Sequence, residues 1–197
     1  KWQVYETKRC NTSKNLNFMQ KLFIDGKKTL SGSINISGSK NSALPILAAT
    51  ILNNHTTIKN VPFVNDIITM LNLLKFIGLK CKFSKKNNSV EVTNFNKNIN
   101  TVAPYKLVKT MRAGVLVLGP LLARYKKAKV SLPGGCAIGT RPVDLHLFAL
   151  KKLGAKIKIK NGYIFASAYD GLKGAKFKFP SISVGATENA ILAAVQA

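Results

Sequence analysis

One cysteine, Cys136, lies in a glycine-rich stretch that is followed closely by charged side chains. Residues 132–146 read LPGGCAIGTRPVDLH. The glycines let the backbone turn sharply and approach a ligand closely, in conformations that larger residues avoid. Pro142 fixes φ just before the apolar run 143–153, which suits the first turn of a helix. Backbone N–H groups at such a helix start, beside Arg141, favour the binding of an anion.

The residue types around Cys136 leave two interpretations open. A thiol that donates a proton needs a pKa near the working pH, which depends on nearby cations and on partial exposure. A single cysteine is more often a small buried hydrophobic residue, and Gly-Gly is a common turn. A functional thiol is therefore one hypothesis of two at this point.

The chain is strongly basic, with a formal net charge of +24 over 197 residues. A basic surface favours nucleic acid, because it neutralises phosphates and releases their counterions. The basic residues, however, are almost all lysines spread along the sequence, and asparagine is abundant too, as an A/T-rich coding bias would produce. We therefore predict a diffusely basic surface without a nucleic-acid partner, and keep a basic nucleic-acid-binding module as the alternative outside enzymes. Such a surface would still attract anionic substrates.

The apolar residues and the cysteines indicate a compartment. No apolar run reaches the roughly eighteen residues of a membrane span, and residues 1–18 lack the apolar core of a secretory signal. Cys10, Cys81 and Cys136 form neither a disulfide framework nor a zinc-binding pattern. These features predict a cytoplasmic protein with no membrane partner and no bound metal.

Hydrophobic periodicity predicts an α/β chain. Strands are expected at 21–24, 30–36, 56–59, 80–83, 90–93, 130–132, 155–159, 163–166 and 175–179. Helices are expected at 43–52, 65–76, 106–125, 143–153 and from 184 onward. Asn65 or Asp66 is the candidate cap of the second helix, and residues 94–104 are expected to form a loop.

This order of elements repeats. Residues 41–43, 111–113 and 188–190 each open a long apolar helix, while 74–80 and 150–156 each end a helix at glycine and enter a strand. The period of roughly seventy residues is longer than that of solenoid repeats. We therefore expect two complete copies and the start of a third.

Lys40 precedes the first repeated helix. The surrounding glycines do not match the P-loop, since five residues separate Gly32 from Gly38 and a serine comes before the lysine. Lys40 remains a candidate point charge for an anion at a helix start.

Five motifs in order resemble the UDP-N-acetylglucosamine enolpyruvyltransferases (1-carboxyvinyltransferases): SGSKNSALPILAA, APYKLVKTMRA, LPGGCAIGTRPVDLH, LGAKI and SVGATENA. The resemblance implies an α/β fold, an inside-out α/β barrel of βαβαββ-type repeats with central helices and outward-facing sheets, here incomplete. Residues 1–18 would be an extension of unknown status, and 19–39 would be strands of an otherwise missing second domain. Residues 40–197 would be the catalytic-loop domain, with two repeats and a truncated third.

The resemblance also implies a reaction. Enzymes of this family transfer the enolpyruvyl group of phosphoenolpyruvate to the 3′-hydroxyl of UDP-N-acetylglucosamine and release phosphate, in the first committed step of peptidoglycan synthesis. No metal or organic cofactor is implied, and the partners are the two small-molecule substrates. The nearest alternative is the shikimate-pathway 3-phosphoshikimate 1-carboxyvinyltransferase, against which the loop cysteine and the run after it argue. No oligomeric state follows from the sequence.

The motifs assign roles to particular residues. Cys136 would be the general acid that protonates the methylene carbon of phosphoenolpyruvate. Lys40 and Asn41 would hold both substrates, and Arg112 would contact the UDP-sugar. The remaining nucleotide-binding residues would be Arg141, Pro142, Val143, Asp144, Leu145, Ser181, Ile182, Ser183 and Val184. Ser181 stands where some family members have lysine, so one diphosphate contact is expected to be weaker or to be made elsewhere.

Other parts of the site are not expected in this chain. We interpret His146 as a helix residue outside the catalytic set. The general base and further arginines are expected beyond residue 197. Because closure of two domains assembles such a site, this chain alone is expected to be inactive or nearly so.

Overall fold

The computed structural model describes residues 29, 31–95, 99–134 and 143–197. The chain divides into two compact units, 1–36 and 37–197. In the first unit, described residues 31–36 contain no strand, so the strand expected across 30–36 is wrong for these residues. A strand is stable only when it is paired, and no described strand pairs with this segment. The strand expected at 21–24 lies outside the described residues.

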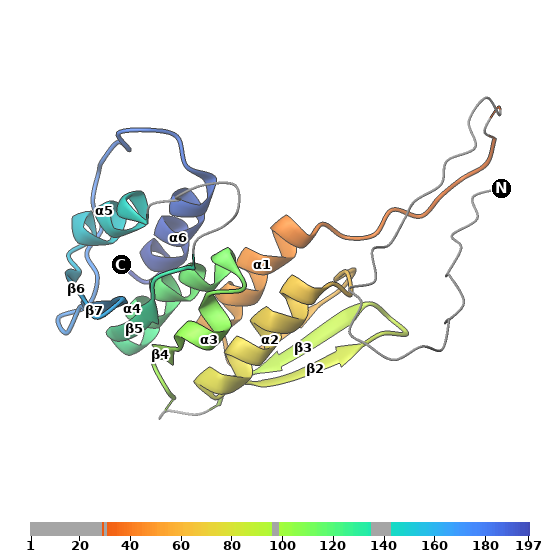
Figure 1. Cartoon of the computed structure of the whole chain (residues 1–197), viewed down its shortest axis with the longest axis horizontal. Coiled ribbons are helices and arrows are strands. Elements are labelled where there is room, and N and C mark those ends of the chain that lie inside the picture. Colours follow the sequence, from red (N-terminus) through yellow and green to blue (C-terminus); the bar gives the residue numbers. More distant parts are fainter. Residues whose placement is uncertain (1–28, 30, 96–98, 135–142) are drawn as a thin grey trace, which may run out of the picture. The chain divides into compact units, whose positions relative to one another are not determined.

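The second unit consists of two successive sets of helices and strands and then one further helix (Figure 1). The first set comprises α1 (Lys40–Ala49), η1 (Thr50–Leu52), β1 (His55–Ile58), α2 (Asn65–Ile77), β2 (Lys80–Ser84) and β3 (Ser89–Thr93). The second comprises β4 (Val102–Ala103), α3 (Tyr105–Val108), η2 (Arg112–Val117), α4 (Leu118–Tyr125), β5 (Lys127–Ser131), α5 (Asp144–Lys152), β6 (Lys156–Lys160) and β7 (Tyr163–Ser167). The further helix is α6 (Val184–Ala194).

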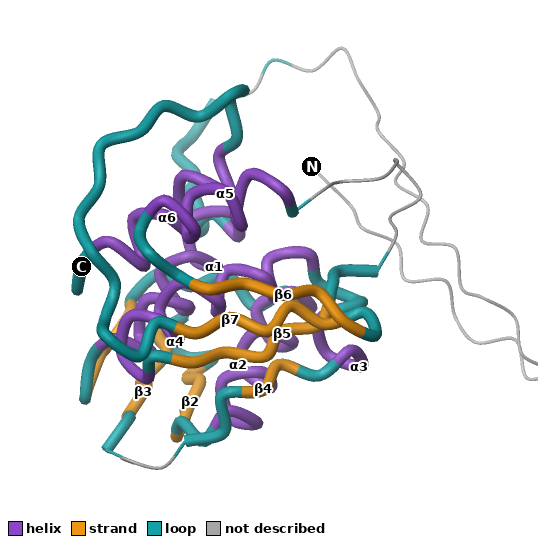
Figure 2. The backbone as a smooth tube through the Cα atoms, turned by 90° about the vertical axis from the view of Figure 1, so that its left-hand side faces the viewer, coloured by secondary structure: helices purple, strands orange, loops and turns teal. Residues whose placement is uncertain are grey.

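Each set contributes one sheet. The first sheet is antiparallel with strand order β1-β3-β2. The second sheet has the order β4-β5-β7-β6 (Figure 2). Its strand β4 is parallel to β5, and its other pairs are antiparallel. Along β3, Val90 and Val92 are buried, and along β7 Ile164 and Ala166 are buried, while their neighbours along the strand are more exposed. Each sheet therefore turns one face to the core and leaves the other accessible.

The helices of both sets share one hydrophobic core with the buried faces of the two sheets. Gly78 and Gly154 both take a positive φ, 118° and 92°, where a helix gives way to a strand. Glycine adopts this conformation without the steric cost that other residues incur. The repeated helix ends at 74–80 and 150–156 are thus confirmed.

The single helix expected at 106–125 is wrong, because the structure has α3, η2 and α4 in its place. Gly114 lies against Val108, where a Cβ atom would be 3.3 Å from the Cα atom of Val108. Pro120 lacks an N–H group and is tolerated only in a first turn, so the regular helix starts close to it, at Leu118.

Two predictions about strands also fail. The expected loop 94–104 contains the short strand β4, whose two residues are too few to show a periodic pattern. The strand expected at 175–179 is not formed. Its alternating aromatic residues serve another purpose, because the rings of Phe177 and Phe179 pack against Phe148 of α5, with centroids 5.9 and 6.1 Å away.

Replacing Gly119 with alanine in the intact protein is expected to destabilise the contact between α4 and α6. A Cβ atom at this position would lie 2.6 Å from the backbone oxygen of Asn189, and closer still to its side-chain oxygen. Overpacking of this kind costs about 1–3 kcal/mol of unfolding free energy. Denaturant unfolding measures the loss. Gly174→Ala is the matched control, because nothing lies within 4 Å of its added carbon; equal stability of the two variants would contradict the packing argument.

Candidate functional site

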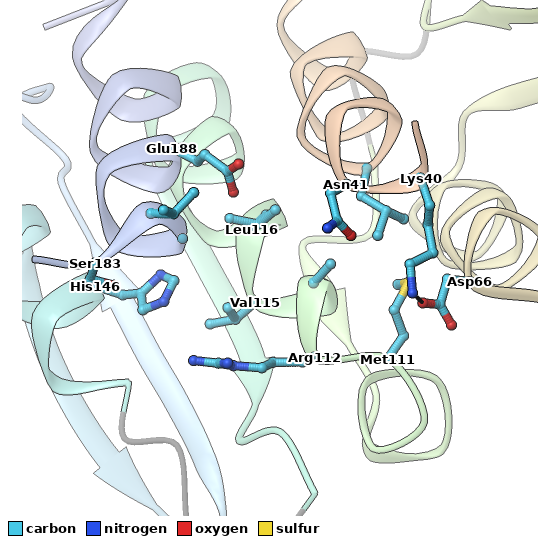
Figure 3. A pocket seen from close by; sticks show the side chains of 14 residues that line it. Lys40, Asn41, Asp66, Met111, Arg112, Val115, Leu116, His146, Ser183 and Glu188 are labelled. Carbon is cyan, nitrogen blue, oxygen red and sulfur yellow. Dashed lines mark ion pairs between the residues drawn. The ribbon is translucent and has the colours of Figure 1, made fainter. Parts of the chain in front are cut away.

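A hollow of about 400 Å³ lies where the starts of α1, η2 and α6 meet, with residues from α2 and α5 completing its wall (Figure 3). Asn41, Arg112 and Glu188 belong to the three segments that the sequence identified as repeated helix openings, and all three line this hollow. The prediction is wrong for 188–190, because α6 already begins at Val184 and Glu188 is its fifth residue. The repeat therefore explains the location of the hollow, because each copy brings the same end of a helix to it.

Lys40 is the first residue of α1, and its ammonium Nζ lies 2.8 Å from Oδ2 of Asp66. The two side chains are 47% and 36% exposed. An ion pair this accessible contributes only about 0–1 kcal/mol. Asp66 can therefore hold the Lys40 ammonium at the hollow and still release it to a stronger anion.

Either Asn65 or Asp66 was expected to cap α2. The N-cap of α2 is instead Val64, and no side-chain hydrogen bond caps the helix. Asp66 lies in the first turn, where a carboxylate is favoured by the helix dipole, and its oxygen pairs with Lys40. Sequence reasoning missed this pairing, because the two residues come from different helices.

Arg112 opens η2, and its side chain extends along the hollow on the same side as His146 (Figure 3). Arg112 is an exposed residue. Arginine presents a planar fork of donors that matches phosphate and carboxylate oxygens, so this position suits an anionic ligand.

His146 is the site residue that the sequence interpretation set aside. Its ring lines the hollow, although the residue is only 4% exposed. Burial, and then the positive charge of Arg112, lower the pKa of His146 from 6.5 to about 4. The imidazole is therefore neutral near pH 7.

Asn189 determines which ring nitrogen of His146 carries the proton. The Gly119 N–H group donates to Asn189 Oδ1 over 2.8 Å, which leaves the amide Nδ2 as the donor to the Val115 carbonyl at 3.3 Å. The same Nδ2 lies 3.1 Å from His146 Nδ1. Because an amide nitrogen only donates, Nδ1 must accept and the ring proton lies on Nε2. If Nδ1 carried the proton, its N–H group would face the N–H group of the Asn189 amide, and neither could accept a hydrogen bond.

The low pKa of His146 predicts a pH-dependent stability. Between pH 6.5 and 4 the unfolded chain binds a proton that the native state excludes, so stability falls as the pH is lowered through this window. The full difference corresponds to about 3 kcal/mol at most. Urea unfolding of the intact protein at several pH values measures it. We expect His146→Gln to flatten this slope and the exposed His55→Gln control to keep it; the opposite pattern would contradict the assignment.

Ser183 caps α6 at the edge of the hollow. Its hydroxyl oxygen accepts a hydrogen bond from the Ala186 N–H over 3.3 Å. Ser183, Val184 and Gly185 all line the hollow. The positive end of the α6 dipole therefore faces the same space as Lys40 and Arg112.

Glu188 is a further residue that the sequence reasoning did not assign to the site. It lines the hollow from α6, and burial raises the pKa of its carboxyl group. Its place in the third repeated segment, 188–190, was the signal that could have identified it.

Several predicted site residues do not line the hollow. Val143 is buried in the core, and Asp144, Leu145, Ser181 and Ile182 lie elsewhere on α5 or on the segment before α6. Cys136, Arg141 and Pro142 lie outside the described residues. The structure therefore brings together Lys40, Asn41, Arg112, Ser183 and Val184, and the roles of all these residues stay predictions.

Comparison with known proteins places the chain in a family. The model of the family described as EPSP synthase (3-phosphoshikimate 1-carboxyvinyltransferase) matches residues 24–197. The chain belongs to the EPSP synthase family. Solved structures agree with this membership at the level of the fold: EPSP synthase from Acinetobacter baumannii superposes with a TM-score of 0.64 at 18% identity, covering 84% of this chain and 38% of that one.

A second member of the fold is the enolpyruvyl transferase NikO from Streptomyces tendae, with a TM-score of 0.62 at 19% identity over 73% of this chain and 31% of that chain. The α/β fold expected for an incomplete enolpyruvyltransferase is thus confirmed.

Curated relatives within the EPSP synthase family are much more similar in sequence. The UDP-N-acetylglucosamine 1-carboxyvinyltransferase of Pelagibacter ubique is 59% identical over 177 residues, which are 89% of this chain and 42% of that protein. The enzyme of the same name from Rickettsia prowazekii is 55% identical over 180 residues, 91% of this chain and 43% of that protein. The chain therefore spans less than half the length of these relatives. Among the described residues, no helix is long and apolar enough to cross a membrane.

Proposed function

We propose that the intact protein containing this chain transfers the enolpyruvyl group of phosphoenolpyruvate to the 3′-hydroxyl of UDP-N-acetylglucosamine and releases phosphate. The observation that carries the proposal is the meeting of three repeated helix starts at one hollow, with Lys40, Asn41, Arg112 and Ser183 in its wall. Relatives that are 54–59% identical carry the name of this activity. In this proposal, the chain supplies one wall of the site.

The charges around the hollow suit both substrates, which are anions. Arg112 offers paired donors to phosphate oxygens, Lys40 offers a point charge, and the start of α6 adds the positive end of a helix dipole. A bound phosphate or carboxylate would replace Asp66 as the partner of Lys40. The neutral His146 adds no charge of its own, so the attraction comes from these three groups.

Cys136 supplies the chemistry in this proposal. Its thiol gives a proton to the methylene carbon of phosphoenolpyruvate while the sugar hydroxyl oxygen bonds to the adjacent carbon. The hydroxyl proton passes to a general base, and a tetrahedral phospholactoyl intermediate results. Loss of a methyl proton and of phosphate then gives the enolpyruvyl product. In the assembled site, the nucleotide would also be contacted by Arg141, Pro142, Val143, Asp144, Leu145, Ser181 and Ile182.

A phosphate-release assay on the intact protein tests the proposal. With phosphoenolpyruvate present, we expect UDP-N-acetylglucosamine to support turnover and shikimate 3-phosphate to support none. Turnover with shikimate 3-phosphate but not with UDP-N-acetylglucosamine would favour the shikimate-pathway reaction. The description of the family refers to that reaction. If neither acceptor supported phosphate release, enolpyruvyl transfer would be contradicted. A role in peptidoglycan synthesis and a cytoplasmic location belong to the same proposal.

A further inference from the structure

The accessible face of the second sheet combines lysines with aromatic rings. In β5 and β7 the side chains on this face alternate with buried residues. The register sets Lys129, Phe165 and Lys158 side by side across β5, β7 and β6. On the neighbouring rows, Lys127 and Lys156 flank Ser167, and Lys160 pairs with Tyr163. We call this set the lysine-aromatic face: Lys127, Lys129, Lys156, Lys158, Lys160, Tyr163 and Phe165.

The lysine-aromatic face is hollowed. A cavity of about 450 Å³ lies over four of its lysines and Phe165, with Tyr169 at its wall. Phe165 is 39% exposed and Tyr169 is 71% exposed. The Lys129 ammonium rests 4.8 Å from the ring centroid of Tyr163 and 5.1 Å from that of Phe165.

Positive charge dominates this face. The described strands β4 to β7 contain no aspartate or glutamate, and the acidic residue that follows them is Asp170, beside Tyr169. The sequence-based argument against nucleic acid depended on lysines being spread along the chain. Folding brings five of them onto one sheet face, because alternate residues of adjacent strands point to the same side.

The first sheet provides an internal comparison. In the first sheet, Lys82 of β2 lies opposite Glu91 of β3. At the equivalent positions of the second sheet, Lys158 of β6 lies opposite Phe165 of β7. Likewise, Ser89 occupies the position equivalent to Tyr163. The buried faces of β3 and β7 are both apolar, so helix packing constrains both sheets alike. The fold therefore accepts an acid where the second sheet has a phenyl ring, and packing does not require the lysine-aromatic face.

We propose that the lysine-aromatic face binds single-stranded nucleic acid. Bases stack on exposed aromatic rings without regard to sequence, and lysines at the sides of the groove neutralise the phosphates. Lys129 would leave the two rings for a phosphate when a base takes its place. This site is separate from the proposed catalytic site, since the two hollows share no lining residue.

The shape of the face favours a strand of nucleotides over a membrane. A bilayer is engaged by apolar side chains that protrude beyond their surroundings. Phe165, in contrast, lies at the wall of a hollow between lysines. A flat base can enter such a hollow, whereas a bilayer surface cannot.

Fluorescence anisotropy with labelled oligo(dT) or oligo(U) of about twelve nucleotides tests the proposal on the intact protein. We expect binding that weakens as salt rises. Phe165→Ala should weaken it about 5-fold or more, as for the loss of one stacked base. Lys129→Gln with Lys158→Gln should weaken it as well and should lower the slope of log affinity against log salt by about 1.4.

The first sheet supplies the control, because Lys80→Gln with Lys82→Gln removes the same charge from β2, at the positions equivalent to Lys156 and Lys158 of β6. This pair should change the affinity little, and excess UDP-N-acetylglucosamine should not displace the oligonucleotide. The absence of binding at low salt would overturn the proposal. An equal loss of affinity in the control pair would also overturn it, because diffuse charge alone would then explain the binding. Binding only to anionic lipid vesicles would overturn it as well. Unchanged enolpyruvyl transfer activity shows that each variant is folded.

Discussion

Replacing Cys136 with alanine in the intact protein is expected to lower the rate constant for enolpyruvyl transfer by about 10²- to 10⁴-fold, the usual contribution of a general acid. Alanine has no proton to give to the methylene carbon. Cys136→Ser should be nearly as slow, because a hydroxyl group is a far weaker acid than a thiol. Steady-state phosphate release measures both variants. A serine variant close to the natural rate would show that this residue does not donate the proton.

The same assignment predicts where an electrophile reacts. Fosfomycin, an epoxide analogue of phosphoenolpyruvate, should alkylate Cys136, and it should do so faster when UDP-N-acetylglucosamine is bound. Cys81 is the internal control, because burial raises the pKa of its thiol to about 11. At pH 7 only about one Cys81 in 10⁴ is then a thiolate, the reactive form. Mass spectrometry that located the adduct on Cys81, or on Cys10, would contradict the assignment.

Arg112→Ala and Arg141→Ala are each expected to weaken UDP-N-acetylglucosamine binding by about 1.5–3 kcal/mol, or roughly 10- to 150-fold, as for the loss of a charge-assisted hydrogen bond. Arg112 lines the hollow directly. The corresponding lysine variants should recover only part of the affinity, since they keep the charge and lose the paired donors. Calorimetry on the intact protein measures each affinity.

Arg124 provides the control for these substitutions. Its guanidinium donates to the Ile51 carbonyl over 3.0 Å and to Asn54 Oδ1 over 2.6 Å, away from the hollow. Arg124→Ala should therefore lower stability and leave the affinity for the sugar nucleotide unchanged. An unchanged affinity in Arg112→Ala or in Arg141→Ala would remove that arginine from the site.

Much of the fold could be predicted because its signals are local. The 3.6-residue period of α2 and the glycine at its end are visible in a short window, and α2 lies within one residue of the expected range. The prediction of a single helix at 106–125 was wrong because the features that divide this segment are not local. Its composition favours a helix, but the close approach of Gly114 to Val108 and the position of Pro120 divide it, and only the folded chain reveals that approach.

The candidate site divides in the same way. Motifs identified Lys40, Asn41, Arg112, Ser183 and Val184, which the structure brings to one hollow. The pairing of Lys40 with Asp66 joins two helices, and no spacing in the sequence predicts it. Similarly, the position of the ring proton of His146 depends on Asn189, 43 positions away, and its neutral state depends on burial and on the charge of Arg112.

The sequence by itself determined the α/β class, the repeat, the family and most candidate ligand-binding residues, because periodicity, glycine positions and motifs are properties of short segments. The tertiary structure alone decided which helix starts share a hollow, which nitrogen of His146 carries the proton, and that five dispersed lysines lie on one sheet face. These features depend on contacts between segments far apart in the chain. Strand register and helix packing set such contacts, and neither is encoded in the spacing of residues along one segment.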